Sequence, residues 1–586
     1  MPRPMVRFGG RFLRWCALVW FGVFVVPGVA LAGGVEFPAD GTRGLGRGGT
    51  SMARADDPTV MIRNPALLAD LWGDQVMLGA HLLIPDACYT PTGPIFFPGG
   101  GDEVVDFGDG PLLASSLAGE PMPKVCYKGP RPFLPSVALT SKLADDLGVG
   151  IAFMPPDVAN LSQWGNRDGT IDTPNGKRPN ILRYLGSHMN VTYFSLLGGV
   201  GYRPVEWLRI GAGLQWNLVA AEVTQFTSAQ PQRLANQDVR VDVFTRDLFI
   251  PGVIASAQIV PTDWLDIALG FKWSDRIKGK ARLDLTTGPF GVDHWIDLGS
   301  TGSPNRTVPT RTYNQSGEVS APPIWVPQIS GSVRYAYRLR PRVRDWKTMR
   351  EASAGKVEDH MSTELFDIEF SFIYYLNSYY DQQVFYSNPS IAKVEFRNLR
   401  NAQGDLSAPA AFKLGNCIQE IQPQGCARTE TPTLFGGKDQ VSMRLGGDYN
   451  ILPGLFALRA GASYESDGQP RGYMNPRYYM FERVGLHGGF TVRVSDNTDI
   501  SFAYAHFFQD PIRTQFNENN LPGNVKLPAS VKADGAKYNY APGNHDGVAL
   551  MEIPYGSINV PGPNFVNAGS FFYNLDVVSL SATQHF

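Results

Sequence analysis

The chain has 586 residues, a formal net charge of −2 and an aromatic content of 12%. A charge so close to zero offers no basic surface, so a nucleic-acid-binding protein is not indicated. No run of 18 apolar residues follows the N-terminal region, which argues against transmembrane helices. A set of soluble domains and one large β-barrel are both allowed. The mean hydropathy of −0.15 fits strands in which only alternate residues face lipid.

Residues 1–32 are expected to be a signal peptide. The apolar part is Trp15–Val26, and Ala30-Leu31-Ala32 is a small-residue cleavage site. A membrane anchor is the weaker alternative because the apolar part is short. No cysteine follows the cleavage site, so a lipoprotein is not indicated. The charged start of the segment consists of Arg3, Arg7, Arg11 and Arg14.

The next stretch, Gly41–Leu68, is rich in glycine and in turns. Asp57-Pro58 and Asn64-Pro65 are turn signals, because proline holds the residue before it in an extended conformation. Five glycines are expected to allow positive φ angles and close packing, and the segment is expected to form no good helix or strand. A segment with few large apolar residues cannot build a core of its own, so another part of the chain is expected to enclose it. The five glycines are Gly41, Gly44, Gly46, Gly48 and Gly49.

Three short runs within this stretch follow one another in a specific order: Gly44–Arg47, Ala55–Asp57 and Arg63–Leu67. Their order and spacing resemble the N-terminal hatch of the FadL/TodX-type outer-membrane transporters. The resemblance implies a hatch at residues 33–72 that plugs a β-barrel of residues 73–586. It also implies uptake of long-chain fatty acids or other hydrophobic molecules. The hatch or gate residues it indicates are Gly44, Gly46, Arg47, Asp56, Asp57, Arg63, Asn64, Pro65 and Ala66.

Strict alternation of apolar and polar residues recurs after residue 73. In 207–218, 265–273 and 441–449 the apolar positions share one face and the polar positions share the other. Period-2 alternation predicts strands. The apolar faces repeatedly end in Trp, Tyr or Phe, which is typical of the aromatic girdle of a membrane barrel. A β-sandwich would alternate as well, but its strands are usually shorter.

The predicted connections alternate in length. Tight turns at 144–146, 203–206, 261–263, 452–454 and 495–497 separate long polar loops, among them 85–132, 155–188, 224–247, 286–323 and 379–438. Short periplasmic turns and long extracellular loops are the outer-membrane pattern. Counting one strand on each side of every loop predicts an all-β transmembrane barrel of about fourteen antiparallel strands, the number that the resemblance implies. The basic connection Arg338–His360 breaks the rule. A solvated periplasmic extension is expected there, and a contact with anionic lipid head groups is the alternative.

The final strand is expected to close the barrel. Val578, Leu580, Ala582 and Phe586 share one face, and Ser579 and its alternate neighbours share the other. Pairing of this strand with the first one would remove both exposed edges. A terminal amphipathic strand ending in Phe resembles the signal read by the barrel-assembly machinery.

Four cysteines remain once the signal peptide is removed. Cys88 and Cys126 fall in one predicted loop, and Cys417 and Cys426 fall in another. An exported protein meets an oxidising compartment, so a disulfide within each loop is expected. A metal site is the poorer interpretation, because no CxxC spacing or nearby histidine accompanies these cysteines.

Basic side chains on the predicted inner faces are candidate substrate contacts, because a cation in a low-dielectric lumen would attract a carboxylate. The alternative is that they pair with carboxylates that also point inward. Those carboxylates are Asp266, Asp367, Glu369 and Asp448. The candidate contacts are Arg209, Lys272, Arg444, Arg459 and Arg493.

The function expected from the resemblance is passive, hatch-gated transport of long-chain fatty acids or similar hydrophobic molecules across the Gram-negative outer membrane. No cofactor and no metal are predicted, and the chain is expected to be monomeric and surrounded by outer-membrane lipids. An outer-membrane enzyme such as a phospholipase is one alternative, but it would need a Ser–His pair on the lipid face. GxSxG and HExxH motifs are absent from the sequence. A structural or adhesive barrel is the other alternative, and it leaves the hatch unexplained.

Overall fold

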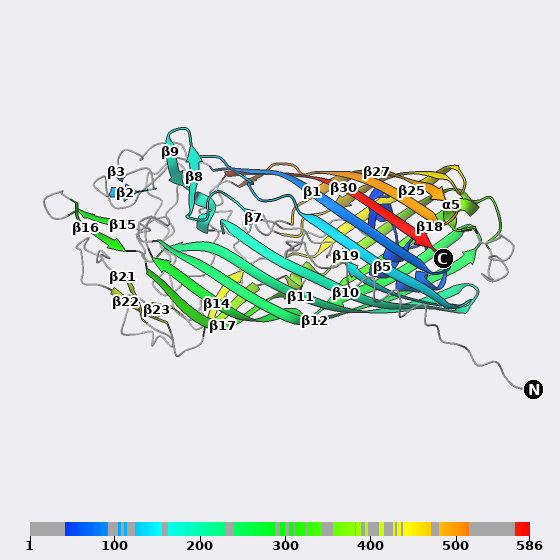
Figure 1. Cartoon of the computed structure of the whole chain (residues 1–586), viewed down its shortest axis with the longest axis horizontal. Helices are drawn as coiled ribbons and strands as arrows, with labels where there is room; N and C mark the ends of the chain where they lie inside the picture. Colours follow the sequence, from blue (N-terminus) through cyan, green and yellow to red (C-terminus); the bar gives the residue numbers. More distant parts are fainter. Residues whose placement is uncertain are drawn as a thin grey trace, which may run out of the picture.

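A closed antiparallel barrel is the main body of the computed structural model (Figure 1). Fourteen wall strands can be followed in the part of the chain that the structure describes. Residues 1–40 lie outside that part, so the predicted signal peptide stays a prediction. The described residues are 41–91, 104–106, 111–113, 123–154, 162–184, 186–228, 238–287, 294–298, 304–309, 311–323, 325–342, 356–380, 382–387, 393–396, 410–414, 426–427, 430–434, 437–469, 480–514 and 569–586.

Each wall strand pairs with its sequence neighbour, and some wall strands are interrupted into two labelled pieces. In order they are β1 (Gln75–Pro91), β5 (Phe133–Ala144), β6 (Leu147–Met154), β10 (His188–Val205), β11 (Leu208–Ser228), β12 (Asp238–Thr262), β13 (Leu265–Ser274) with β14 (Arg276–Thr287), β17 (Arg311–Pro323) with β18 (Gln328–Arg338), β19 (Glu364–Tyr375) with β20 (Gln382–Ser387), β24 (Glu430–Leu434) with β25 (Gln440–Leu452), β26 (Phe456–Glu465), β27 (Arg483–Ser495), β28 (Thr498–Phe508) with β29 (Ile512–Thr514), and β30 (Gly569–His585).

The barrel closes between its first and last strands. β1 and β30 pair from Gln75 opposite His585 to Pro91 opposite Gly569, without a register shift. β1 pairs with β5 on its other side. The predicted closure by the C-terminal strand is therefore confirmed, and neither terminal strand leaves an open edge.

The two ends of the barrel differ. The five predicted tight turns lie at one end, with the C-terminus and the short helix α5 (His360–Thr363), which is the right-hand end in Figure 1. The other end carries further short strands: β2 (Val104–Asp106), β3 (Pro111–Leu113), β4 (Val125–Cys126), β7 (Ser162–Gln163), β8 (Thr170–Thr173), β9 (Gly176–Pro179), β15 (His294–Leu298), β16 (Pro304–Pro309), β21 (Lys393–Phe396), β22 (Ala410–Leu414) and β23 (Cys426–Ala427).

Several wall strands extend into segments that were predicted to be loops. β1 runs to Pro91, and β11 and β12 stay paired from Thr224 opposite Asp242 to Ser228 opposite Asp238. The β11 extension, Thr224–Ser228, carries polar residues on both faces. The β12 extension keeps the alternation, with Val239 and Val241 on the face opposite Asp238, Arg240 and Asp242, but it lies within a long polar stretch that was assigned to a loop. The backbone ladder continues there because N–H and C=O groups pair regardless of side-chain polarity.

The outer surface of the wall is apolar and its inner surface is polar. On β11, Leu214 is 71% exposed, whereas Arg209 on the inner face is 1% exposed. On β30, Leu580 is 57% exposed and Ser579 is 1% exposed. An apolar belt that faces outward is what a lipid bilayer requires, so the predicted transmembrane barrel is confirmed.

None of the described helices is long and apolar enough to cross a membrane.

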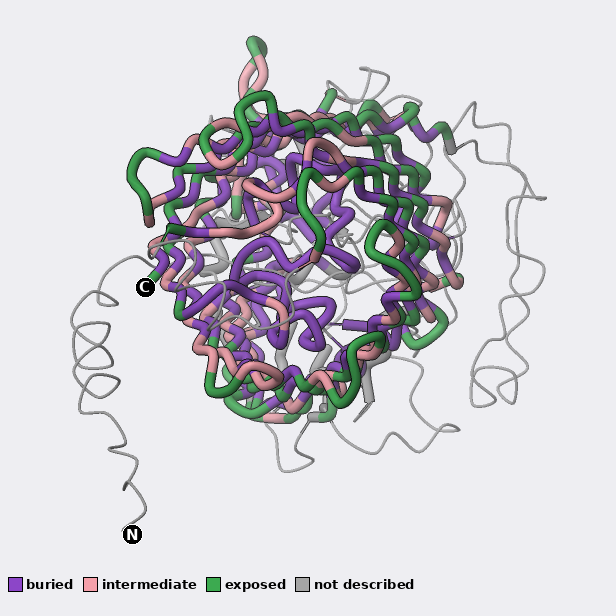
Figure 2. The backbone as a smooth tube through the Cα atoms, turned by 90° about the vertical axis from the view of Figure 1, so that its right-hand side faces the viewer, coloured by how far each residue is buried: buried purple, intermediate pink, exposed green. Residues whose placement is uncertain are grey.

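Residues 41–72, called the hatch segment below, lie inside the barrel (Figure 2). The segment forms three short helices: α2 (Gly41–Gly46), η1 (Pro58–Ile62) and η2 (Pro65–Ala69). These helices have five or six residues each, so the segment forms short turns of helix and no long one. Gly41, Gly48 and Gly49 have positive φ, whereas the remaining two glycines of the predicted set lie within α2.

Candidate functional site

Two arginines of the hatch segment contact carboxylates on the inner face of the wall. Arg47 pairs with Asp367 (Nη2–Oδ2, 2.7 Å), Asp448 (Nη1–Oδ1, 2.6 Å) and Glu369 (Nη2–Oε2, 3.3 Å). Arg54 shares Asp367 (Nη1–Oδ1, 2.7 Å) and Asp448 (Nη2–Oδ2, 3.2 Å). All these side chains are buried. Pulling one partner away would leave a buried charge unpaired, so the contacts fix this part of the segment against β19 and β25.

A second group of ion pairs joins the start of the segment to β28. The Nη2 atom of Arg43 lies 2.8 Å from Asp499 Oδ2, and its Nη1 atom lies 3.0 Å from Asp56 Oδ1. Asp499 also accepts from Arg493 at 2.7 Å and contacts His585 Nε2 at 3.1 Å. Two guanidinium groups thus saturate this carboxylate, and residues 41–57 are held to the wall at two separate places.

The predicted residue Asp57 caps η1. Its Oδ1 atom accepts a hydrogen bond from the backbone N–H of Thr59 at 2.8 Å, as an N-cap residue does. Burial raises the pKa of the Asp57 carboxyl, and the nearby Arg43 opposes that shift. The neighbouring Asp56 behaves differently. Its burial would also raise the pKa, but Arg54 and Arg43 outweigh it and hold the pKa below the usual range.

The predicted turn at Asn64 and Pro65 connects η1 to η2. Asn64 Nδ2 donates to the carbonyl of Met52 at 2.5 Å, and its Oδ1 accepts from the N–H of Ala66 at 3.2 Å. Pro65 occupies the first position of η2, where its missing N–H costs nothing. The N–H of Ala66 also donates to Ser256 Oγ on β12 at 3.0 Å. Arg63 donates to Gln328 Oε1 at 3.4 Å.

Residues 58–72 contact the wall mainly through apolar side chains. This part, called the η half, packs against β1, β5, β6, β10 and β12. The cluster that results joins Ala55, Val60, Met61, Ile62, Leu67, Leu68 and Leu71 to Met77, Ala138, Ala152, Met154, Leu197 and Ile254. The hatch segment therefore has an arginine-held half, residues 41–57, and an apolar η half.

Glycines of the wall let it approach the backbone of the hatch segment. A Cβ atom at Gly446 would lie 1.9 Å from the carbonyl oxygen of Arg47, and one at Gly211 would lie 2.1 Å from the N atom of Ala66. Only a glycine fits such a close approach. Sequence reasoning missed this role, because an inward glycine in a strand looks the same whether or not another backbone faces it.

The five candidate substrate contacts all point inward, and four of them take part in ion pairs. Arg209 contacts Asp70, Arg444 contacts Glu465, Arg459 contacts Asp448, and Arg493 contacts both Asp359 and Asp499. Lys272 differs, because its Nζ lies 4.1 Å from the centre of the Trp325 ring, a cation–π distance. The four arginines therefore pair with inward carboxylates, as the alternative interpretation of the sequence expected. Contact of any of the five cations with a substrate stays a prediction.

The half of the barrel away from the tight turns carries an inward-facing apolar cluster, called the aromatic lumen cluster. Trp164 lies 5.8 Å from Phe571, and Tyr193 lies 6.3 Å from Trp325, between ring centres. Leu45 of α2 belongs to the same cluster, so it reaches the hatch segment. Its other large members include Tyr89, Met189, Tyr375, Tyr380, Met480, Phe481, Phe507 and Tyr573.

One Ser–His pair faces the lumen. Ser463 Oγ and His487 Nε2 are 2.9 Å apart, and both side chains are buried. A phospholipase of the outer membrane would need such a pair on the lipid face of the barrel. The position of this pair therefore gives no support to that alternative.

The basic connection after β18 folds back over the end of the barrel instead of extending into solvent. Arg342 Nη2 lies 2.7 Å from Asp266 Oδ1, and Arg338 Nη1 lies 2.8 Å from Glu364 Oε1. Arg340 alone of the described arginines here is well exposed, and it pairs with Glu358. The expectation of a solvated extension was wrong for residues 338–342, because buried carboxylates on β13 and β19 attract these cations. Residues 343–355 lie outside the described part of the chain.

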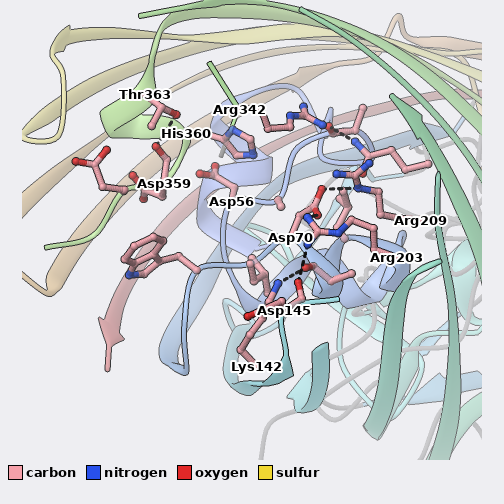
Figure 3. Close-up of a pocket in the computed structure, with 18 of the residues that line it drawn as sticks. Asp56, Asp70, Lys142, Asp145, Arg203, Arg209, Arg342, Asp359, His360 and Thr363 are labelled. Atoms are coloured by element: carbon pink, nitrogen blue, oxygen red, sulfur yellow. Dashed lines mark hydrogen bonds and ion pairs between the residues drawn. The ribbon is translucent and has the colours of Figure 1, made fainter. Parts of the chain in front are cut away.

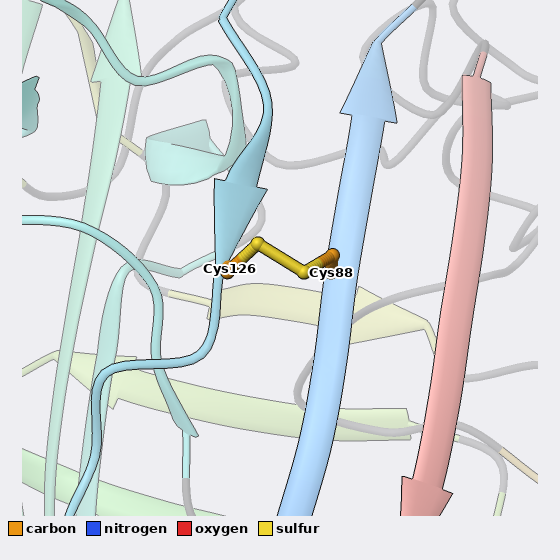
Figure 4. Close-up of a disulfide and its surroundings, with 2 residues drawn as sticks. All are labelled: Cys88 and Cys126. Atoms are coloured by element: carbon orange, nitrogen blue, oxygen red, sulfur yellow. A yellow bond between two sulfur atoms is a disulfide. The ribbon is translucent and has the colours of Figure 1, made fainter. Parts of the chain in front are cut away.

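A disulfide joins Cys88 to Cys126 (Figure 4). Cys88 lies on β1 and Cys126 on β4, which pair side by side, so neither residue is in the loop to which the sequence assigned it. The bond ties the segment before β5 to the first wall strand at the end that carries the extra short strands. The predicted pair of Cys417 with Cys426 cannot be placed, because Cys417 is outside the described residues.

The contact of Asp70 with the wall predicts how the η half responds to pH. Burial would raise the pKa of Asp70, but Arg209 and Arg342 outweigh it and lower the pKa below the usual value of about 4. A lowered pKa in the folded state gives stability that is complete above pH 4 and is lost as pH falls further. Hydrogen exchange of residues 65–74 should therefore be equal at pH 7 and pH 5 after correction for the intrinsic rate. Faster exchange of these residues at pH 5 than at pH 7 would contradict the lowered pKa of Asp70.

Comparisons with known proteins extend the picture of the fold. No family model matches the sequence, and no curated protein matches it. Among solved structures, a Pseudomonas aeruginosa FadL homologue superimposes with a TM-score of 0.57 and 14% identity, covering 95% of this chain and 100% of that one. The P. putida toluene transporter TodX gives a TM-score of 0.51 and 10% identity, covering 93% and 98%. At such identities the likeness concerns the fold. The chain therefore has the fold of the FadL/TodX-type transporters, which the runs at residues 44–67 resemble.

Proposed function

We propose that this protein carries long-chain fatty acids or similar hydrophobic molecules passively across the outer membrane of a Gram-negative cell, and that the hatch segment is its gate. One observation carries the proposal most directly. The hatch segment lies across the interior of a barrel whose outer belt is apolar. Buried ion pairs fix one half of the segment to the wall, and apolar contacts hold the other half.

The aromatic lumen cluster supports a hydrophobic substrate. An apolar molecule that enters from the end with the extra strands would meet Trp164, Tyr193 and Trp325 before it reaches Leu45 of the hatch segment. Burial of apolar surface against such side chains is favourable by about 25 cal/mol per Å². Lys272 beside Trp325 supplies positive charge for a carboxylate head group. This cation favours a fatty acid over an uncharged hydrocarbon.

The η half is the part that moves in this proposal. A hydrophobic substrate can replace the contacts that Met61, Leu67 and Leu68 make with the wall, because one apolar surface substitutes for another. It cannot replace the carboxylates around Arg47 and Arg54. Displacement of residues 58–72 therefore opens a passage while residues 41–57 stay attached to β19, β25 and β28.

The proposed function is tested by measuring oleate uptake in cells that lack their own fatty-acid transporter. Expression of this protein should restore uptake, and toluene uptake is measured in parallel. Restored uptake of toluene without oleate would replace the fatty-acid assignment by aromatic hydrocarbons. If neither compound enters faster than in cells with an empty vector, the transport proposal fails.

Asn64→Ala is expected to change the rate of uptake without preventing barrel assembly. The substitution removes the bonds to Met52 and Ala66, and an unmade buried hydrogen bond costs about 1–3 kcal/mol. That is enough to shift the hatch segment between two arrangements, yet small beside the stability of a closed barrel. Surface display and heat-modifiable gel mobility should match wild type. Unchanged uptake by a normally assembled variant would exclude this turn from the gate.

A further inference from the structure

The pocket between the hatch segment and the tight-turn end of the barrel holds balanced charges. Figure 3 shows Arg203 and Arg209 beside Asp70 in this pocket, with Asp56 and Asp359 on the opposite side. The Nε atom of Arg209 lies 2.8 Å from Asp70 Oδ2, and Asp56 and Asp359 are paired with arginines as well. Cations and carboxylates paired in this way need no ligand. A group of exposed cations on the outer face of the wall differs, because two of them have no carboxylate partner among the described residues.

Four cations lie close together on the outer face of β12 and β14, toward the end of the barrel away from the tight turns (Figure 1). Lys278, Lys280 and Arg282 alternate with buried residues along β14, so they share its outward face. Arg246 on β12 is the direct cross-strand partner of Lys280. Neighbours on one face of a strand are about 7 Å apart, and direct partners on adjacent strands are about 5 Å apart. These four exposed residues are called the basic strip below.

The basic strip begins where the apolar outer belt ends. Along the wall strand formed by β13 and β14, the outward residues change from Leu269 and Phe271 to the cations of the strip. On β12, the exposed Leu248 and Phe249 lie on the tight-turn side of Arg246. The short turns of an outer-membrane barrel face the periplasm. The basic strip is therefore at the outer-leaflet boundary of the belt, where lipid head groups lie.

The two ends of the basic strip are paired with neighbouring carboxylates. Lys278 Nζ lies 3.3 Å from Asp275 Oδ2, and Arg282 Nη2 lies 3.2 Å from Asp284 Oδ2. The Arg282 guanidinium also lies 4.3 Å from the centre of the Phe244 ring, a cation–π distance. Both cations remain more than half exposed. Exposed ion pairs of this kind are weak, so these ends can still contact an anion from outside.

The centre of the basic strip is not neutralised. Arg246 and Lys280 form no ion pair with any residue that the structure describes. Glu318, opposite Lys280 on β17, is exposed and forms none either. The strip and its adjacent carboxylates thus amount to four cations and three anions, with two like charges directly opposite each other on β12 and β14. Such a cross-strand pair destabilises the ladder, and an anion placed between the two cations would remove the repulsion.

We propose that the basic strip binds a phosphate group of an anionic lipid in the outer leaflet, while the acyl chains of that lipid lie against Phe249 and the apolar belt. A phosphate monoester carries a charge of about −1.5 to −2 at pH 7 and offers three strong acceptor oxygens, enough to contact both Arg246 and Lys280. The site goes beyond the proposed function. It depends on the outer-membrane location and not on the molecule that the barrel carries.

Lipid binding by the purified full-length protein in detergent micelles tests the site. The probe is lipid A with its phosphate groups, titrated against the protein and read by native mass spectrometry. The same lipid after phosphatase treatment is the comparison. Arg246→Gln with Lys280→Gln removes the two unpaired cations. Lys124→Gln with Lys128→Gln is the matched control, because it removes the same charge from exposed residues at the same end of the barrel, beside β4.

Wild type should bind the phosphorylated probe more tightly than the treated one. Arg246→Gln with Lys280→Gln should weaken binding of the phosphorylated probe by about tenfold or more, as expected when two cations no longer contact a phosphate. The control should match wild type. Equal affinity of wild type and Arg246→Gln with Lys280→Gln, or an equal loss in the control, would overturn the site. Displacement of the probe by inorganic phosphate would overturn a lipid as the occupant. Oleate uptake enters none of these outcomes, so failure of the site would leave the proposed function standing.

Discussion

Replacing Gly446 with alanine should force the hatch segment away from the wall while the barrel still assembles. The new Cβ atom would lie 1.9 Å from the carbonyl oxygen of Arg47, far inside contact distance. Both groups belong to the backbone of packed elements, so neither can turn aside as a flexible side chain would. Overpacking of a buried site costs about 1–3 kcal/mol, occasionally more, and the upper end is expected here. The ladder between β19 and β25 does not need the missing Cβ.

The measurement compares Gly446→Ala with Gly198→Ala. Gly198 lies on β10, and a Cβ there would meet nothing within 4 Å, so this variant serves as the control. Protease access to residues 41–72 in intact barrels should rise in Gly446→Ala and stay at the wild-type level in Gly198→Ala. Heat-modifiable mobility should be normal in both. Equal protection of the segment in both variants would show that the close approach of Arg47 is not needed to hold it.

Arg47→Met should detach the arginine-held half of the hatch segment. Methionine keeps much of the side-chain volume but leaves Asp367, Glu369 and Asp448 without the guanidinium that joins them. Breaking a buried ion pair by removing one partner costs about 3–5 kcal/mol. Arg54 and Arg334 remain beside Asp367, so the lower end of that range is expected. Cells with this variant should become sensitive to bulky hydrophobic antibiotics, because the detached segment would no longer block the interior of the barrel.

Arg340→Met is the control for this prediction. Its pair with Glu358 is exposed, and such pairs contribute about 0–1 kcal/mol. Antibiotic sensitivity and hydrogen exchange of residues 41–57 should therefore stay at wild-type levels. If Arg47→Met leaves both measurements unchanged as well, the ion pairs do not anchor the segment.

The wall of the barrel was predictable from the sequence because the bilayer imposes a simple rule on it. Ile210, Leu214 and Trp216 face outward and Arg209 and Gln215 face inward, as period-2 alternation predicts. Beyond the membrane that rule ends. The β11 extension and the strand position of Cys88 carry no clear apolar pattern, and the alternating Val239 and Val241 of the β12 extension lie within a long polar stretch. All three were therefore assigned to loops. The folding-back of Arg338 and Arg342 was also missed. It depends on ion pairs with Glu364 and Asp266, and alternation along a strand does not show which charges meet.

The candidate site was predictable only in part. The runs at residues 44–67 located the hatch segment, and inward alternation placed Asp367, Glu369 and Asp448 in the lumen. Neither signal specifies that Arg47 meets all three, because those contacts span more than 300 positions of the chain. Arg43, Arg54 and Asp499 were missed as well. The cue that could have found them is the concentration of arginines in a short segment that must be enclosed, since buried cations need inward carboxylates.

The most direct test of the account asks which half of the hatch segment moves. A Cβ atom at Gly199 on β10 would lie 3.5 Å from Met61 Cβ on η1, within the range of a disulfide. Met61→Cys with Gly199→Cys would therefore fix the η half to the wall when oxidised. Thr42→Cys with Ser579→Cys fixes the arginine-held half, where the two native hydroxyl oxygens are 2.8 Å apart. Oleate uptake is measured before and after reduction, with wild type as the control for the reductant. The account predicts that the first bond stops uptake until it is reduced and that the second leaves uptake unchanged. Full uptake with the Met61–Gly199 bond closed would contradict it.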